Sequence, residues 1–196
     1  IALGYKGNMI KDYFLNYHYR NSNLSVNLST GQTEILDKHS SNWTVNLIDT
    51  GVDTMTGGRL LRLKDYLSDA PFMLTYGDGV TDINIRDLAD YHQSHNKVGT
   101  VSAVRPSARF GAINCKGDQV ASFEEKPQTG EGWINGGFFV FNPGIFDYIE
   151  NDTTILERAP LEKMANDQQL MTFKHTGYWQ CMDTMRDKLT ERLEFR

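Results

Sequence analysis

Short apolar runs and helical patterns alternate along most of this 196-residue chain. Residues 72–76 form a continuous apolar run typical of a buried parallel strand, residues 85–95 show a helical pattern, and residues 98–104 are expected to form another strand. A strand, a helix and a second strand in this order form a unit in which the two strands run parallel. The alternation therefore predicts the α/β class with a mainly parallel sheet.

The remaining segments extend this pattern. Strands are expected at residues 1–3, 24–28, 44–48, 138–141 and 170–174, a hairpin is expected between 112–115 and 120–123, and helices are expected at 60–67, 143–150, 156–166 and 184–193. The residues after 4–7 also read as a helix, with Met9, Ile10, Tyr13, Phe14 and Tyr17 on one apolar side. No repeat or linker interrupts the series, which predicts one domain over residues 1–196 in three α/β/α layers.

The charge balance argues against a polynucleotide partner. Lys and Arg number 20 against 25 Asp and Glu, so the formal net charge is −5 and no general basic surface is available for phosphate backbones. No apolar run is long enough to cross a bilayer, and residues 1–7 lack the features of a signal peptide. We therefore expect a cytoplasmic protein with neither a nucleic-acid nor a membrane partner.

Two residue pairs resemble metal ligands without forming a full ligand set. Cys115 and Cys181 show no metal-type spacing, so reduced thiols without an assigned role are expected. His92 and His95 are three apart on an expected helix, but no third ligand recurs nearby. A surface pair is therefore the preferred interpretation of the histidines.

Asp78 is the first candidate for a functional acid. It stands between Gly77 and Gly79, directly after the apolar run at residues 72–76. Open α/β sheets bind ligands at the carboxyl ends of their strands, and flanking glycines let a phosphate or a metal approach the backbone. Asp-Gly is also a common turn dipeptide, so a purely structural turn stays open as an alternative.

A second acid, Asp183, stands just before the last expected helix. Mg²⁺ binds through one or two carboxylates together with phosphate oxygens, so Asp78 and Asp183 would fit a nucleotide-phosphate site if the fold brought them together. The alternative is that Asp183 caps the helix by accepting a bond from a backbone amide.

Three further strings have residue types suited to phosphates or sugars. Lys126 precedes Pro127, whose ring restricts the preceding residue and so limits where the ammonium group points, although a solvated hairpin end is the alternative. Gly58 and Arg59 lead into an expected helix, where exposed amides can hold an anion or a base edge. Asn135-Gly136-Gly137 precedes a strand and either approaches a sugar closely or makes a β-bulge.

In order along the chain, these strings resemble the sugar-phosphate nucleotidyltransferase family, and within it the glucose-1-phosphate cytidylyltransferases. The strings are Gly4-Tyr5-Lys6-Gly7, Asp49-Thr50-Gly51, Thr56-Gly57-Gly58-Arg59, Tyr76-Gly77-Asp78-Gly79, Arg109-Phe110-Gly111-Ala112, Glu125-Lys126-Pro127, Asn135-Gly136-Gly137-Phe138-Phe139 and Trp179-Gln180-Cys181-Met182-Asp183-Thr184. Each string is modest alone, and their common order makes the resemblance specific.

The resemblance implies a Rossmann-like α/β/α fold of the nucleotide-diphospho-sugar transferase type, and transfer of a cytidylyl group from CTP to glucose-1-phosphate. Asp78 and Asp183 match the aspartates that hold Mg²⁺, and Lys126 matches the lysine that grips the sugar phosphate. The positions that line the sugar pocket are matched by Gly111, Glu125, Asn135 and Gly136, whereas Gly58 and Arg59 match the loop beside the nucleotide base.

The sequence departs from the family at its beginning. Family members start with a strand and a G-G-x-G-T-R loop that holds the triphosphate through backbone amides, and neither occurs here, so we expect impaired turnover or, alternatively, a non-catalytic sugar-phosphate or nucleotide-binding module. Because that strand lies in the middle of the family's sheet, we also expect another copy of the chain, in a homo-oligomer, or a rearranged strand to cover the gap.

Overall fold

The computed structural model describes residues 1–37, 41–105, 112–116, 119–124 and 132–184. They form two compact units, one of residues 1–66 and 149–157 and the other of residues 67–148 and 158–196, and each unit is described by itself. The expectation of one domain over residues 1–196 is not tested by this division and stays a prediction.

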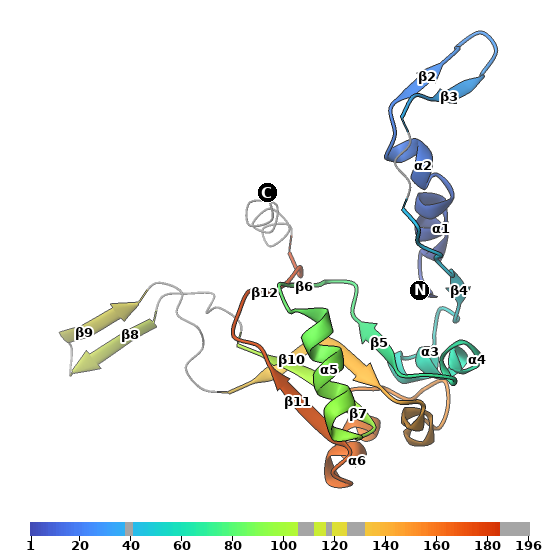
Figure 1. The fold of residues 1–196 in the computed structure, drawn as a ribbon. Helices are drawn as coiled ribbons and strands as arrows, with labels where there is room; N and C mark the ends of the chain where they lie inside the picture. The colour runs from blue at the N-terminus through green and yellow to red at the C-terminus, as the bar shows by residue number, and fades with distance from the viewer. Residues whose placement is uncertain (38–40, 106–111, 117–118, 125–131, 185–196) are drawn as a thin grey trace. The chain divides into compact units, whose positions relative to one another are not determined.

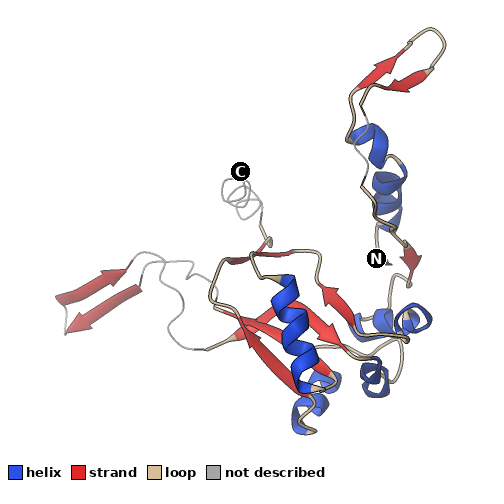
Figure 2. Cartoon of the chain, in the orientation of Figure 1, coloured by secondary structure: helices blue, strands red, loops and turns tan. Residues whose placement is uncertain are grey.

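The first unit consists of short elements. Their order is β1 (Ala2–Leu3), α1 (Gly7–Leu15), α2 (Tyr17–Arg20), β2 (Leu24–Val26), β3 (Thr33–Ile35), β4 (Ile48–Asp49), α3 (Thr56–Arg62) and the start of α4 (Lys64–Leu67). Strands β1 and β4 pair in parallel, and β2 and β3 form an antiparallel hairpin that follows the two short helices (Figure 2). Strand β3 was not expected, and the strand expected at residues 44–48 is wrong except at its last residue, where β4 begins.

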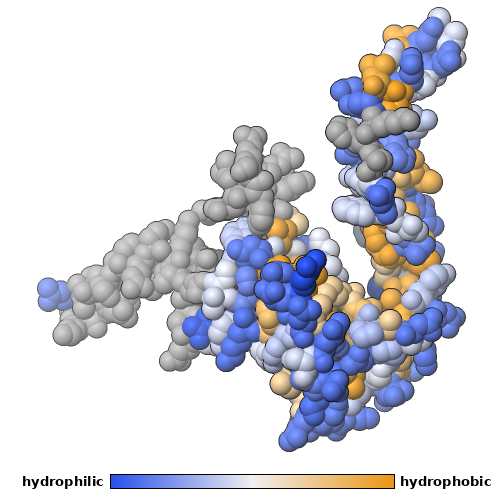
Figure 3. All heavy atoms as spheres, in the orientation of Figure 1, coloured by the Kyte–Doolittle hydropathy of each residue, from blue (hydrophilic) through white to orange (hydrophobic). Residues whose placement is uncertain are grey.

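The helix expected after residue 7 exists, but its apolar side is largely exposed. Met9, Ile10 and Tyr13 expose 65 %, 38 % and 41 % of their surface, and all six residues of β2 and β3 are exposed as well. Figure 3 shows apolar side chains on the surface over these elements. Much of the apolar side that the sequence predicts for this helix is therefore open to solvent in the described residues.

The second unit is built on a mixed sheet in the order β11-β7-β10-β5. The strands are β5 (Phe72–Thr75), β7 (Gly99–Val104), β10 (Ile134–Phe141) and β11 (Leu170–Lys174), and the helical elements are α5 (Ile85–His95), η1 (Pro143–Tyr148) and α6 (Ala159–Asn166). Helix α5 and strand β11 have the expected bounds. In the described residues no helix is long and apolar enough to span a membrane.

Alternation along β10 explains the three layers of this unit. Val140 packs with Leu88 of α5 on one face, whereas Phe139 and Phe141 stack on each other on the opposite face, where Phe72 contacts both Phe141 and Phe146 of η1. Helix α5 lies across one face of the sheet, and α6 lies on the other side (Figure 1). The α/β class and the layered sheet are therefore confirmed.

One strand of this sheet is reversed. Strands β5, β7 and β11 run in the same direction, whereas β10 is antiparallel to both β7 and β5, so the sheet is mixed and mainly parallel, as predicted. Strand β5 runs in the same direction as β7, as the predicted strand–helix–strand unit requires, but β10 lies between them. The expected burial of β5 is wrong, because in the described residues β5 lies at the sheet edge with alternate residues exposed.

Two antiparallel pairs complete the second unit. Strands β8 (Ala112–Lys116) and β9 (Gln119–Glu124) pair as the hairpin that the sequence predicts. Strands β6 (Gly79–Thr81) and β12 (Trp179–Cys181) pair with each other, although they come from opposite ends of the unit's sequence. The helix expected at residues 184–193 lies outside the described residues except at residue 184.

Candidate active site

Asp78 and Asp183 lie close together because the β6–β12 ladder joins the segments that carry them. Cys181 pairs with Gly79 in the ladder, and the Met182 amide donates to the Asp78 carbonyl oxygen at 2.8 Å, which extends the pairing by one step. Carboxylate oxygens of both aspartates lie within 4.8 Å of each other and of the Cys181 sulfur. Both carboxylates are exposed, so a ligand can reach them from solvent.

Cys181 belongs to this cluster, and the sequence assigned it no role. Its thiol donates to Asp183 Oδ1 at 3.2 Å. Burial, followed by the hydrogen bond to Asp183 and the negative charge of Asp78, raises the pKa of the Cys181 thiol to about 11. The thiol is therefore protonated near neutral pH and acts as a hydrogen-bond donor toward the acids. In the sequence, only the position of Cys181 two residues before Asp183 indicated that its thiol could lie near the acids.

Asn135 and Gly136 lie at a β-bulge, one of the two alternatives that the sequence left open. The register between β10 and β7 shifts between Asn135 and Phe139, and Gly137 has a φ of 78°. Asn135 Oδ1 accepts from the Gly137 amide at 2.8 Å, so the side chain that was expected to meet a sugar also stabilises the bulge. A Cβ atom on Gly136 would come within 2.7 Å of Ser102 Oγ, so the bulge has no room for a side chain there.

The bulge contacts the segments that carry both acids. The Tyr76 amide donates to the Gly137 carbonyl oxygen at 3.2 Å, and Tyr76 lies two residues before Asp78. The Trp179 indole N–H donates to the Gly136 carbonyl oxygen at 2.7 Å from strand β12, which leads to Asp183. The structure therefore places Asp78, Asp183, Asn135 and Gly136 in one connected part of the second unit.

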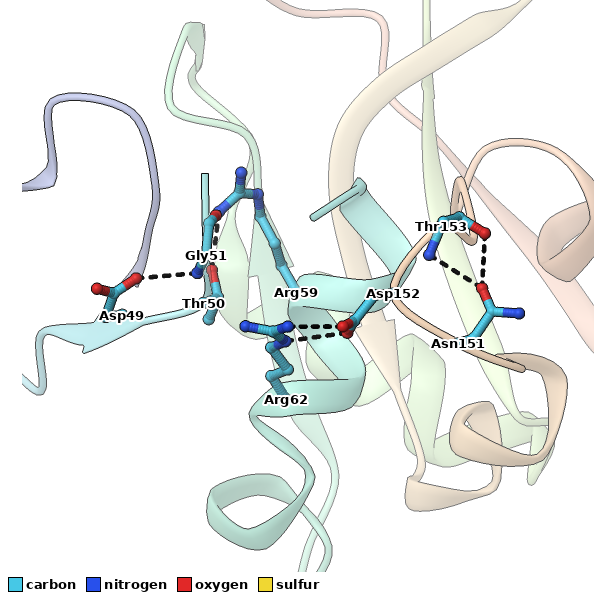
Figure 4. Close-up of polar contacts among 8 residues, drawn as sticks. All are labelled: Asp49, Thr50, Gly51, Arg59, Arg62, Asn151, Asp152 and Thr153. Carbon is cyan, nitrogen blue, oxygen red and sulfur yellow. Dashed lines mark hydrogen bonds and ion pairs between the residues drawn. The ribbon is translucent and has the colours of Figure 1, made fainter. Parts of the chain in front are cut away.

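Gly58 and Arg59 lie in the first unit, and contacts within that unit occupy both. Figure 4 shows the Arg59 guanidinium group directed toward Thr50 and Gly51. The amides of Gly57 and Gly58 both donate to the Thr154 carbonyl oxygen, at 2.9 and 3.2 Å. The expectation that this helix entrance exposes free amides is therefore wrong for both glycines. Thr154 lies almost one hundred residues downstream of these glycines, and no local sequence pattern indicates the contact.

The Arg59 guanidinium group joins the ends of β1 and β4. It donates to the carbonyl oxygens of Leu3, Gly51 and Val52 at 3.1, 2.8 and 3.2 Å and to Thr50 Oγ1 at 2.8 Å. Such a planar fork satisfies several acceptors at once. In this structure Arg59 stabilises the fold of the first unit, and its expected place beside a nucleotide base stays a prediction.

The remaining expected residues divide into two groups. Gly111, Glu125 and Lys126 lie outside the described residues. His92 and His95 do not form a surface pair, because His92 is 2 % exposed and His95 is half-buried between α5 and β7. Both rings bond the Thr100 hydroxyl group at 2.8 Å, and neither belongs to the metal-type cluster found in the described part of the chain.

The sequence pattern of the nucleotidyl transferase family matches residues 33–187. The match spans most of the chain and includes Asp78, Asp183 and the Asn135–Gly137 bulge. The chain therefore belongs to the nucleotidyl transferase family.

Within this family, the chain is similar to glucose-1-phosphate cytidylyltransferases. The chain is 46 % identical to the glucose-1-phosphate cytidylyltransferase of Salmonella typhimurium, over 96 % of this chain and 74 % of the relative. It is 40 % identical to a probable glucose-1-phosphate cytidylyltransferase of Bacillus subtilis, with the same coverage of both chains. The resemblance inferred from the ordered motifs is thus confirmed.

Solved structures confirm the fold class. HddC from Yersinia pseudotuberculosis has a TM-score of 0.60 at 19 % identity, covering 100 % of this chain and 77 % of that chain. A putative glucose-1-phosphate thymidylyltransferase from Bacillus anthracis has a TM-score of 0.55 at 16 % identity, covering 75 % and 64 % of the two chains. The fold is therefore that of the nucleotide-diphospho-sugar transferases.

Proposed function

We propose that this protein transfers a cytidylyl group from CTP to glucose-1-phosphate, giving CDP-glucose and pyrophosphate, with Asp78 and Asp183 as ligands of Mg²⁺. The observation that carries the proposal is the approach of these two carboxylates within 4.8 Å from distant parts of the sequence. The similarity to glucose-1-phosphate cytidylyltransferases supports the choice of substrates.

The donor set fits a hard divalent cation. Family members generally use a divalent metal ion, and Mg²⁺ is usually bound by one or two carboxylates together with substrate phosphate oxygens. Exposed carboxylates leave room for such phosphate oxygens. When bound, the ion would supply positive charge to the phosphate oxygens of the reacting nucleotide.

In the proposed reaction, an oxygen of the sugar phosphate forms a bond to the α-phosphorus of CTP while the bond to pyrophosphate breaks in line. No dedicated base is required, because the second pKa of a phosphate monoester is about 6 and its oxygen is mostly ionised near neutral pH. We assign to Lys126 the role of offsetting charge on the sugar phosphate.

The remaining residues of the proposed site would hold the substrates in position. Asn135 and Gly136, together with Gly111 and Glu125, would line the sugar pocket, and the bulge holds Asn135 in one orientation through its bond to the Gly137 amide. Gly58 and Arg59 would lie beside the base. A bound sugar phosphate would thereby be oriented toward the nucleotide.

The first test measures pyrophosphate release with CTP, glucose-1-phosphate and Mg²⁺. We expect Asp78→Asn and Asp183→Asn each to lower kcat/KM by about 10²–10³-fold, since losing a ligand of the metal removes several kcal/mol of charge stabilisation. Asp90→Asn, an exposed aspartate on α5, is the matched control and should leave the rate unchanged. Wild-type rates in both variants would contradict the two-carboxylate mechanism.

The same assay tests which nucleotide the protein uses and whether it catalyses the transfer or only binds the substrates. CTP is compared with ATP, GTP and UTP, and calorimetry measures binding of glucose-1-phosphate and of each nucleotide. Binding without turnover would favour the binding module, and slow turnover with CTP would agree with the impaired transfer expected from the sequence. The cytoplasmic location and the homo-oligomer remain predictions.

A further inference from the structure

One indole hydrogen bond links the strand that leads to Asp183 with the bulge beside the sheet. Trp179 opens strand β12 and pairs with Thr81 of β6, while its ring N–H reaches across to the Gly136 carbonyl oxygen at 2.7 Å. Gly136 is buried, so this carbonyl group has lost access to bulk water. A buried carbonyl group that loses its hydrogen-bond partner destabilises the fold, so the indole N–H is needed at this position.

The indole hydrogen bond lies beside the segment that carries Asp78. A Cβ atom on Gly79 would lie 3.9 Å from both the Gly136 oxygen and the Trp179 indole nitrogen, an ordinary contact distance, so the β6 backbone next to Asp78 borders this hydrogen bond. On the other side of the bulge, a Cβ atom on Gly136 would contact Ser102 and Val104 of β7. The indole is therefore held between the ladder that carries the acids and the sheet that carries the bulge.

We propose that Trp179 is a positioning residue: its indole N–H holds the Gly136 carbonyl group and so sets where the β6–β12 ladder, with Asp78 and Asp183 at its end, lies relative to the Asn135–Gly137 bulge. Trp179 need not touch substrate or metal in this role. The inference rests on the proposed assignment of the two aspartates as metal ligands.

The matched variants are Trp179→Phe and Ser102→Ala. Trp179→Phe removes the N–H group and keeps an aromatic ring. Ser102→Ala also removes one hydrogen bond at the bulge, in which the Phe138 amide donates to Ser102 Oγ at 3.2 Å, but Ser102 lies on β7, which carries neither acid. A general loss of bulge stability would affect both variants alike, whereas positioning through Trp179 would affect only the first.

The readout is the dissociation constant for Mn²⁺ alone, measured by electron paramagnetic resonance well below the melting midpoint of each variant. We expect Trp179→Phe to weaken Mn²⁺ binding about tenfold, as loss of an orienting partner typically does, and Ser102→Ala to leave it unchanged. With substrates present, the KM for glucose-1-phosphate should also rise in Trp179→Phe and stay unchanged in Ser102→Ala. If Trp179→Phe does not fold, Trp179→Tyr is used in its place, since it also removes the indole N–H group.

Each outcome decides the inference. Equal Mn²⁺ affinity in wild type and Trp179→Phe, an equal loss in Ser102→Ala, or no Mn²⁺ binding by the wild type would overturn it. If the wild type binds Mn²⁺ but releases no pyrophosphate with any nucleotide, the proposed function fails, and the Mn²⁺ affinities of the variants still judge the role of Trp179.

Discussion

Gly58 has no space for a side chain, because helix α3 packs directly on the main chain of residue 152. A Cβ atom on Gly58 would lie 2.6 Å from Asp152 Cα, closer than any real Cβ contact, and the obstacle is backbone. Main-chain atoms are unable to move aside as the end of a long side chain does. At this residue, close packing within the first unit explains the glycine without any ligand.

Gly58→Ala should therefore destabilise the protein by about 1–3 kcal/mol, as overpacking does. Gly77→Ala is the matched control, since a Cβ atom there meets nothing within 4 Å and no positive φ is imposed. Its free energy of unfolding should stay within about 1 kcal/mol of the wild type. Urea unfolding curves measure both, and equal stability of the two variants would show that α3 is free to shift.

Two histidines of helix α5, His92 and His95, share hydrogen bonds with Thr100 of strand β7. These bonds indicate which ring nitrogen of each neutral histidine carries the proton. The Lys97 amide donates to His95 Nδ1 at 3.1 Å, so neutral His95 has its proton on Nε2 and donates to Thr100 Oγ1. The Thr100 hydroxyl group can then donate to His92 Nδ1. A proton added to His92 Nδ1 would leave this hydroxyl group facing two donors.

The consequence is a pH-dependent stability. Burial lowers the pKa of both His92 and His95 below the ordinary value, with a further contribution to His95 from the positive charges of His92 and Lys97. Folded histidines thus resist protonation, so their contribution to stability is complete above about pH 6.5 and is lost as the pH falls below that value through the folded-state pKa.

Urea unfolding between about pH 7.5 and pH 5.5 checks this prediction, because the free energy of unfolding should decrease over that range. His92→Gln should flatten the decrease, whereas His18→Gln, on the exposed face of α2, should leave it as in the wild type. The same pH slope in His92→Gln as in the wild type would contradict the assignment.

Across the whole molecule, burial is distributed unevenly between elements. Strands β7 and β10 hold fully buried residues such as Thr100, Ser102, Phe139 and Phe141, whereas every residue of β2 and β3 is exposed. A two-stranded hairpin without a packed face is marginally stable in water. Local stability should therefore differ strongly between these two parts of the chain.

Hydrogen exchange followed by mass spectrometry measures this difference. Amides of β7 and β10 should be the slowest to exchange, and those of β2 and β3 should exchange with little protection. Strong protection of the hairpin would mean that another surface covers its exposed apolar residues. Repeating the measurement over a range of protein concentrations would then test whether that surface is a second copy, as a homo-oligomer requires.

Local patterns in the sequence determined the elements that are long and regular. Helix α5 and strand β11 have the predicted bounds because the apolar periodicity of each segment is complete within its own residues. Asp78 and Asp183 could also be identified as candidates from the sequence, since Asp78 directly follows a predicted strand, Asp183 directly precedes a predicted helix, and both belong to the ordered series of family motifs. The family itself followed from that order of motifs.

Only the tertiary structure decided which groups meet. The antiparallel insertion of β10 between β5 and β7, the hydrogen bonds from the Gly57 and Gly58 amides to Thr154, the burial of His92 and the place of Cys181 beside two acids all depend on contacts between distant segments. Such contacts follow from sheet topology and from the packing of whole elements. Side-chain periodicity within one segment predicts neither of them.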